Sequence, residues 1–102
     1  MSIKSYQTDI LNNKKQQGFN TTNIEKEFLF LYGEVAEAFD AYKKDSDTLG
    51  EELADVAIYL LGLSEILNID LDKEIQKKME TNKKRKYYIN SNNYAEEEKT
   101  ER

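Results

Sequence analysis

The stretch EELADVAIYLLGL, residues 51–63, decides the fold. From Leu53 to Leu63 it is apolar around almost the whole circumference of a helix, and Asp55 is its one charged residue. A helix without a polar face must be buried on several sides. A chain of 102 residues can hardly surround such a helix alone, so we expect a second copy of the chain to pack on it.

The segments on either side also have helical periodicity, with apolar residues at steps of three and four. Together with the central segment they predict four helices, over residues 3–17, 23–44, 49–67 and 71–84. Gly18 and Asn68 are expected to end the first and third helices. Thr22 and Thr48 each precede a glutamate by three residues, so we expect each of them to open a capping box.

In the second helix, the spacing of apolar residues predicts one stripe that faces the core. Its members are Ile24, Phe28, Leu31, Val35, Ala38 and Tyr42. The chain has no proline and only four glycines, which argues against a β protein. We therefore predict an all-α protein, an antiparallel bundle of about four helices completed by oligomerisation, over residues 1–89. Residues 90–102 are predicted to form a polar tail.

Composition excludes several kinds of site. The chain has no cysteine and no histidine, so thiolate or imidazole metal sites, cysteine nucleophiles and histidine bases are excluded. The formal net charge of −5 argues against a nucleic-acid partner. No apolar run reaches the roughly 18 residues of a membrane span, and residues 1–10 lack the apolar centre of a signal peptide. We expect a cytoplasmic protein without a membrane partner.

Two pairs of carboxylates could carry chemistry. Glu34 and Glu37 are three residues apart, as are Glu52 and Asp55, so each pair shares one face of its helix. A short loop makes the two helices antiparallel neighbours, which lets the pairs face each other. Four carboxylates at close range need a compensating cation. Oxygen ligands alone suit Mg²⁺, with Mn²⁺ as a substitute.

Asp55 strengthens this interpretation, because an unpaired carboxylate in an apolar stretch is costly. The alternative is a solvated acidic face without a metal, since 20 of the 102 residues are acidic and such spacings then arise by chance. The capping box is a sufficient explanation for Glu51. We expect Glu27 and Asp40 to be ordinary surface residues.

Four segments of the chain, in this order and at these spacings, resemble the MazG-like superfamily. They are GEVAEAF at 33–39, EELADVAIYLLGL at 51–63, NIDL at 68–71 and KKMETNKKR at 77–85. The superfamily consists of all-α nucleoside triphosphate pyrophosphohydrolases that are related to dimeric dUTPases. The likeness extends over about residues 24–87 and is nearest to small single-domain members, some of which act on deoxycytidine triphosphate.

This resemblance implies an activity and a metal site. Its E-x-x-E and E-x-x-D pattern makes Glu34, Glu37, Glu52 and Asp55 the Mg²⁺ ligands. It implies hydrolysis between the α- and β-phosphates, which yields a nucleoside monophosphate and pyrophosphate, in a homodimer or homotetramer. One of Glu34 or Glu37 is also expected to orient or deprotonate the attacking water, as a catalytic residue. A role in nucleotide-pool cleaning would follow.

Other residues are candidates for contacts with the substrate. Tyr59 lies one turn after Asp55 on the same face. It could stack on a base or form a hydrogen bond with the substrate, or could equally be a core tyrosine with its hydroxyl at the surface. Lys78, Asn82 and Arg85 share one face of the fourth helix and match a pattern of relatives; they could bind phosphates, or could stabilise the helix C-terminus.

The linker between the first two helices has similar alternatives. Phe19 and Asn20 could belong to a base pocket, or Phe19 could simply pack on the core. Some relatives stack the base on tryptophan, and this chain has none.

Two other functions remain open at this stage. A phosphoribosyl-ATP pyrophosphohydrolase-like enzyme has a similar fold and chemistry, although the GEVAEAF context favours the small MazG-like group. A non-catalytic helical dimerisation or adaptor protein is the other alternative, and in it the acidic residues would only be a solvated face.

Overall fold

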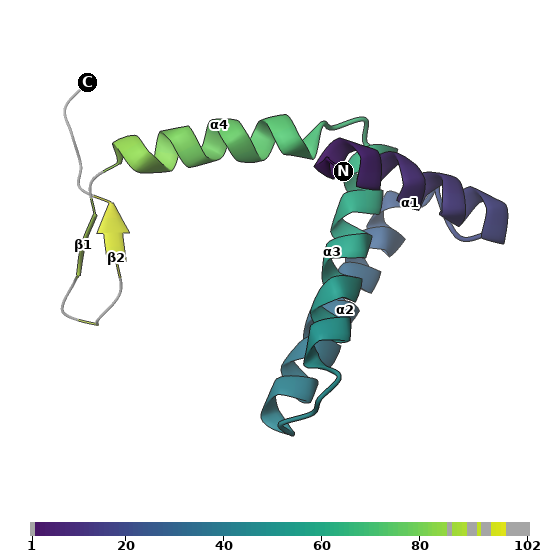
Figure 1. Cartoon of the computed structure of the whole chain (residues 1–102), viewed down its shortest axis with the longest axis horizontal. Helices are drawn as coiled ribbons and strands as arrows, with labels where there is room; N and C mark the ends of the chain where they lie inside the picture. The colour runs from purple at the N-terminus through teal and green to yellow at the C-terminus, as the bar shows by residue number, and fades with distance from the viewer. Residues whose placement is uncertain (1, 86, 90–91, 93–94, 98–102) are drawn as a thin grey trace. The chain divides into compact units, whose positions relative to one another are not determined.

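The computed structural model describes residues 2–85, 87–89, 92 and 95–97. It has four helices, α1 (Ile3–Gln17), α2 (Ile24–Lys43), α3 (Leu49–Ile66) and α4 (Leu71–Lys84) (Figure 1). The predicted all-α helical bundle is therefore confirmed, with one addition. Two short antiparallel strands that we did not predict, β1 (Tyr87–Ile89) and β2 (Ala95–Glu97), follow α4.

The chain divides into two compact units, Met1–Asp72 and Lys73–Arg102. The first contains α1, α2 and α3, and the second contains nearly all of α4 and both strands. Most of the tail predicted over 90–102 lies outside the described residues, and the boundary at residue 90 stays a prediction. Among the described residues, no helix is long and apolar enough to cross a membrane.

Local sequence explains where the helices begin and end. The Ser2 side chain accepts a hydrogen bond from the Ser5 N–H at the start of α1, and Gly18 ends α1 in the left-handed conformation with φ of 76°. Such a φ suits glycine because it has no Cβ. Asn68, with φ of 59°, follows α3 in the same conformation. These ends agree with the sequence prediction.

Neither predicted capping box forms. The side chain of Asn23, and not that of Thr22, caps α2 by accepting a hydrogen bond from the Lys26 N–H. Thr48 is at the cap position of α3, as predicted, but its side chain makes no capping hydrogen bond. Its hydroxyl lies 2.8 Å from that of Ser46 instead.

The central element of the first unit is α3, on which both α1 and α2 pack (Figure 1). α2 and α3 are antiparallel neighbours joined by residues 44–48. α1 comes very close to α3 at Gly62, where a Cβ would lie 3.1 Å from Ile10 Cγ2 and 3.5 Å from Lys14 Cδ. The absence of a side chain at Gly62 therefore sets the position of α1.

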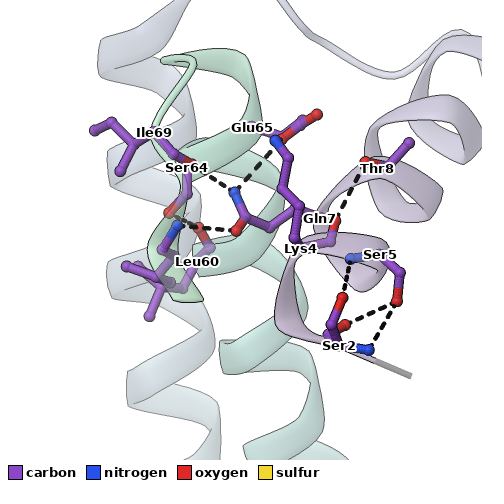
Figure 2. Close-up of polar contacts among 10 residues, drawn as sticks. Ser2, Lys4, Ser5, Gln7, Thr8, Leu60, Ser64, Glu65 and Ile69 are labelled. Atoms are coloured by element: carbon purple, nitrogen blue, oxygen red, sulfur yellow. Dashed lines mark hydrogen bonds and ion pairs between the residues drawn. The ribbon is translucent and has the colours of Figure 1, made fainter. Parts of the chain in front are cut away.

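A buried amide holds α1 to the turn after α3 (Figure 2). Gln7 is fully buried. Its Nε2 donates to the carbonyl oxygen of Ile69 at 2.7 Å, and its Oε1 accepts from the Leu71 N–H at 3.0 Å. Next to it, Lys4 Nζ lies 2.6 Å from Glu65 Oε1. Gln7 Nε2 also lies 3.5 Å from Glu65 Oε1. Because the Ile69 and Leu71 partners are backbone groups, they fix the course of the turn that leads into α4.

The core of the described chain is small and more polar than predicted. Its buried apolar residues are Ala38, Ala41 and Leu63. Of the stripe predicted on α2, only Ala38 is buried, and Phe28, Val35 and Tyr42 are exposed. The face of α2 toward the rest of the unit is instead the adjacent one, which carries Glu27, Leu31, Glu34, Ala38 and Ala41.

The expectation that α3 is buried on several sides is also not met within one chain. Leu53, Ile58 and Leu60 are 41% or more exposed. The apolar pattern indicates that these faces avoid water, but α1 and α2, the other helices of the first unit, leave them uncovered. Ile75 and Met79 of α4 are exposed as well.

Candidate metal centre and adjoining pocket

Three carboxylates meet between α2 and α3. Glu34 and Glu37 of α2 and Glu52 of α3 each offer one oxygen, and these oxygens all lie within 4.8 Å of one another. We call these residues the glutamate triad. Glu34 and Glu52 are half-buried and Glu37 is exposed. The antiparallel packing of two consecutive helices thus brings together residues that are up to 18 positions apart in the sequence.

Burial and the repulsion between neighbouring carboxylates raise the pKa of two members of the triad, Glu34 and Glu52. Burial is the main cause that raises the pKa of Glu34 above its usual value, followed by the charge of Glu37 and a hydrogen bond with it. Burial, and then the charges of Glu37 and Asp55, raise the pKa of Glu52 in the same way. No cationic side chain contributes to either shift. Within the part of the chain that the structure describes, the causes that act on these two carboxylates are thus burial and like charge, both of which disfavour the ionised form.

Two oxygens of the triad are also without a hydrogen bond. Among the described residues, Glu34 Oε2 and Glu52 Oε2 are buried side-chain atoms with no hydrogen-bond partner. A buried carboxylate oxygen without a partner is costly, and native proteins rarely leave one. A hard divalent cation takes oxygen ligands at close range. The donor set and the unpartnered oxygens thus fit such a cation.

Asp55 is placed differently from the expectation. It is exposed and is not a member of the triad, so the argument that its carboxylate is buried in an apolar helix was wrong. It does lie close enough for its charge to raise the pKa of both Glu34 and Glu52. The ligand roles of the four acidic residues, Asp55 included, stay predictions.

Tyr59 lies beside the triad. Burial raises the pKa of its phenol, and the charges of Glu34, Glu27, Asp55 and Glu37 raise it further. The hydroxyl therefore stays protonated at neutral pH and can donate a hydrogen bond. The ring packs edge-on against Phe30, with centroids 6.1 Å apart.

Tyr59 is also part of the wall of a pocket of about 430 Å³, which is in the range of small-molecule sites. α1, the α1–α2 linker, α2 and α3 all contribute to it. We call it the aromatic pocket, and it is lined by Asn13, Lys14, Gly18, Phe19, Asn20, Lys26, Glu27, Phe30, Ile58 and Tyr59. The sequence suggested Phe19 and Asn20 as residues of a base pocket, and in the structure both line the aromatic pocket.

The pocket contains a buried ion pair that the sequence analysis missed. Lys14 Nζ of α1 binds Glu27 Oε1 of α2, and Glu27 is 1% exposed. The expectation that Glu27 is a surface residue was wrong, because α1 covers it and supplies a cation. Asp40, by contrast, is exposed as expected. Glu27 precedes Glu34 by seven residues, so helical spacing could have placed it on the same face.

The predicted phosphate contacts belong to the other compact unit. Lys78 and Asn82 are exposed on α4, and Arg85 follows its end. Arg85 Nε lies 3.3 Å from Glu97 Oε2, and Arg85 Nη1 lies 3.5 Å from Asn82 Oδ1. Their role in substrate binding stays a prediction.

Comparison with known proteins gives one match. The family model described as MazG-like matches residues 10–101. Neither the curated proteins nor the solved structures contain a match to the chain.

Proposed function

The chain belongs to the MazG-like family, and on this premise we propose that it is an Mg²⁺-dependent nucleoside triphosphate pyrophosphohydrolase. It would cleave a ribo- or deoxyribonucleoside triphosphate between the α- and β-phosphates, to the monophosphate and pyrophosphate. The family suggests nucleotide pyrophosphohydrolase-type function and is typically metal-dependent. The substrate, the metal and a role in nucleotide-pool cleaning are our proposal.

The observation that carries the proposal is the pair of unpartnered oxygens, Glu34 Oε2 and Glu52 Oε2. A solvated acidic face would let each oxygen bind water, whereas these two are buried beside other carboxylates. Glu34, Glu37 and Glu52 would hold the cation, with Asp55 as the fourth proposed ligand. When bound, a divalent cation would neutralise the charge of the phosphate oxygens.

The aromatic pocket supports a nucleoside triphosphate as the substrate. Glu27 in the pocket and Glu34 in the triad are seven residues apart on α2, which is two turns or about 10 Å along the helix. A ribose and the α-phosphate have to fit between a nucleobase and the phosphoanhydride that is cleaved. Tyr59 adjoins both places, since it is part of the pocket wall and is close to Glu34.

The chain's own carboxylates would act on the attacking water. Glu34 or Glu37 would accept a hydrogen bond from that water and take its proton as it attacks phosphorus. The protonated phenol of Tyr59 would donate a hydrogen bond to a substrate oxygen. Lys78, Asn82 and Arg85 are proposed to bind the outer phosphates, since two cations and an amide suit that charge.

We further propose that the enzyme is a homodimer or homotetramer. The aromatic and apolar stripe Phe28, Tyr32, Val35, Phe39 and Tyr42 is exposed along α2. A stripe at helical spacing of this length is typical of an interface between helices. Burying it against a second copy would remove the apolar surface that one chain leaves in water. A cytoplasmic location stays a prediction.

The experiment is a panel of natural and modified ribo- and deoxyribonucleoside triphosphates, incubated with the full chain and Mg²⁺ or Mn²⁺. We expect pyrophosphate release from at least one of them. Glu37→Gln should lower the release by about 100-fold or more, and Asp40→Asn, on the same helix outside the triad, should leave it unchanged. No turnover of any member would reject the proposal and favour the adaptor protein.

A further inference from the structure

The most unusual feature outside the glutamate triad is the ion pair of Lys14 and Glu27. Both residues are almost fully buried, at 8% and 1% exposed, and they join α1 to α2. Asn20 Nδ2 donates a second hydrogen bond to Glu27, to Oε2 at 3.2 Å. The same amide group also donates to the backbone oxygen of Asn23 at 2.9 Å, so the cluster is held in a fixed geometry.

Stability alone is a weak explanation for this pair. Removing two charges from water costs several kcal/mol per ion, and apolar residues of similar size often stabilise a fold as well or better. Other positions in the pocket wall do carry apolar or aromatic side chains, namely Phe19, Phe30, Ile58 and Tyr59. The pair is thus a buried, charged spot in a pocket whose lining surface is mainly apolar, which is the usual arrangement where a ligand has to be oriented.

The pair still has unused hydrogen-bonding capacity. The Lys14 ammonium has three donors, of which Glu27 takes one, and it lies 5.2 Å from the centroid of the Tyr59 ring. Each oxygen of the Glu27 carboxylate can accept two hydrogen bonds. Oε1 binds Lys14 and Oε2 binds Asn20, so each retains one lone pair. Both residues line the pocket, so a donor and an acceptor lie next to each other in its wall.

We propose that Lys14 and Glu27 determine which nucleobase the enzyme accepts. A flat base enters between the aromatic side chains of Phe19, Phe30 and Tyr59. Its edge then places an acceptor against the Lys14 ammonium and a donor against the Glu27 carboxylate. The ligand class is a nucleobase with an exocyclic amino group next to an unprotonated ring nitrogen, as in cytosine and adenine, because that edge offers both partners at adjacent positions.

This inference rests on the proposed function, since only a nucleotide substrate brings a base to this pocket. It gives different roles to the glutamate triad and to the Lys14–Glu27 pair, whose residues on α2 lie at different points along that helix. The triad around Glu34 acts on the phosphates, which all nucleotides share. The pair around Glu27, two turns away, distinguishes one base from another. A change at the pair should therefore alter the ratio of kcat/KM between substrates.

The test compares each base with an analogue that lacks its exocyclic group. The substrates are cytidine and 2-pyrimidinone riboside triphosphates, and adenosine and unsubstituted purine riboside triphosphates. For its preferred base, the wild type should lose about 10- to 100-fold in kcat/KM with the analogue. In the double variant Lys14→Met/Glu27→Leu, the kcat/KM values for the base and for its analogue should agree within about threefold, because an apolar pair makes no hydrogen bond to either substrate.

A matched control and a folding check accompany the double variant. Lys4→Met removes the other ion pair of α1, which Lys4 makes with Glu65 outside the pocket, and should keep the wild-type ratio. Thermal melting checks that the double variant folds. If it does not, Glu27→Gln keeps the shape of the side chain and adds a donor in place of an acceptor, so the ranking of the bases should still change.

The outcomes separate this inference from the proposed function. If the wild type hydrolyses triphosphates and the folded variants keep its ranking of bases, the inference is wrong and the function stands. If the wild type hydrolyses none, calorimetry with free nucleosides still tests the pocket. Binding that the wild type shows and the double variant loses supports the inference, and equal binding or none overturns it.

Discussion

Glu34 and Glu52 come from different helices, yet each buries its Oε2 atom without a hydrogen-bond partner. The charge of Glu37 raises the pKa of both. The two helices are thus held together although their carboxylates repel each other. Four expectations follow about cations, pH, helix packing and assembly.

Mg²⁺ should stabilise the protein against heat at neutral pH. A cation that binds the folded state alone adds about 2.7 kcal/mol of stability at 100 times its Kd. Thermal melting with increasing Mg²⁺ measures the rise in Tm. Glu52→Gln should abolish most of the rise, and Glu51→Gln, its exposed neighbour, should not. An equal rise in both variants would place the cation elsewhere.

Without a divalent cation, stability should fall as pH rises through the acidic range. The raised pKa values of Glu34 and Glu52 mean that the folded state binds more protons than the unfolded state above the ordinary glutamate value of 4.5. The free energy of unfolding then decreases as pH rises from that value through the raised values, and it stays lower above them.

Chemical denaturation in EDTA over a pH series measures this effect. The double variant Glu34→Gln/Glu52→Gln should reduce the slope, because its amides do not titrate. Mg²⁺ should counteract the loss at the upper end of the series, where the carboxylates are ionised. A wild-type slope equal to that of the double variant would show that the triad does not contribute.

Gly62→Ala should destabilise the first compact unit. The new Cβ would lie 3.1 Å from Ile10 Cγ2, so the Ile10 side chain has to shift by a few tenths of an ångström in a packed contact, at a cost of about 1–3 kcal/mol. Gly50→Ala is the matched control on the same helix, because nothing lies within 4 Å of its Cβ. That change should be neutral or stabilise the helix by up to about 1 kcal/mol. Urea denaturation distinguishes the two, and equal effects would contradict the close packing of α1 on α3.

The exposed stripe of α2 should mediate assembly. Light scattering of the wild type should give the mass of a dimer or a tetramer. Phe39→Asp should shift the mass toward the 11.9 kDa monomer, because a charge would be buried in an apolar interface. Phe19→Asp, also at an exposed aromatic residue but in the linker before α2 and outside the stripe, is the control and should leave the mass unchanged. A monomeric wild type would contradict the proposal.

Much of the candidate site could be predicted from the sequence, but not its details. The i, i+3 spacing placed Glu34 beside Glu37 on α2, and the short loop to α3 brought Glu52 to them. Asp55 was misjudged, because apolar neighbours such as Leu53 suggested burial whereas both residues are exposed in one chain. Composition alone cannot say whether an apolar face is covered by the same chain or by another.

The sequence by itself determined where the helices lie and that carboxylates gather on two of them. Both depend on local interactions: backbone hydrogen bonds between residues four positions apart, and residues that end a helix, such as Gly18. Only the tertiary structure decided which face of α2 is buried and that Lys14 pairs with Glu27. These contacts depend on how α1 crosses α3 at Gly62, a relation between distant segments that no local pattern contains.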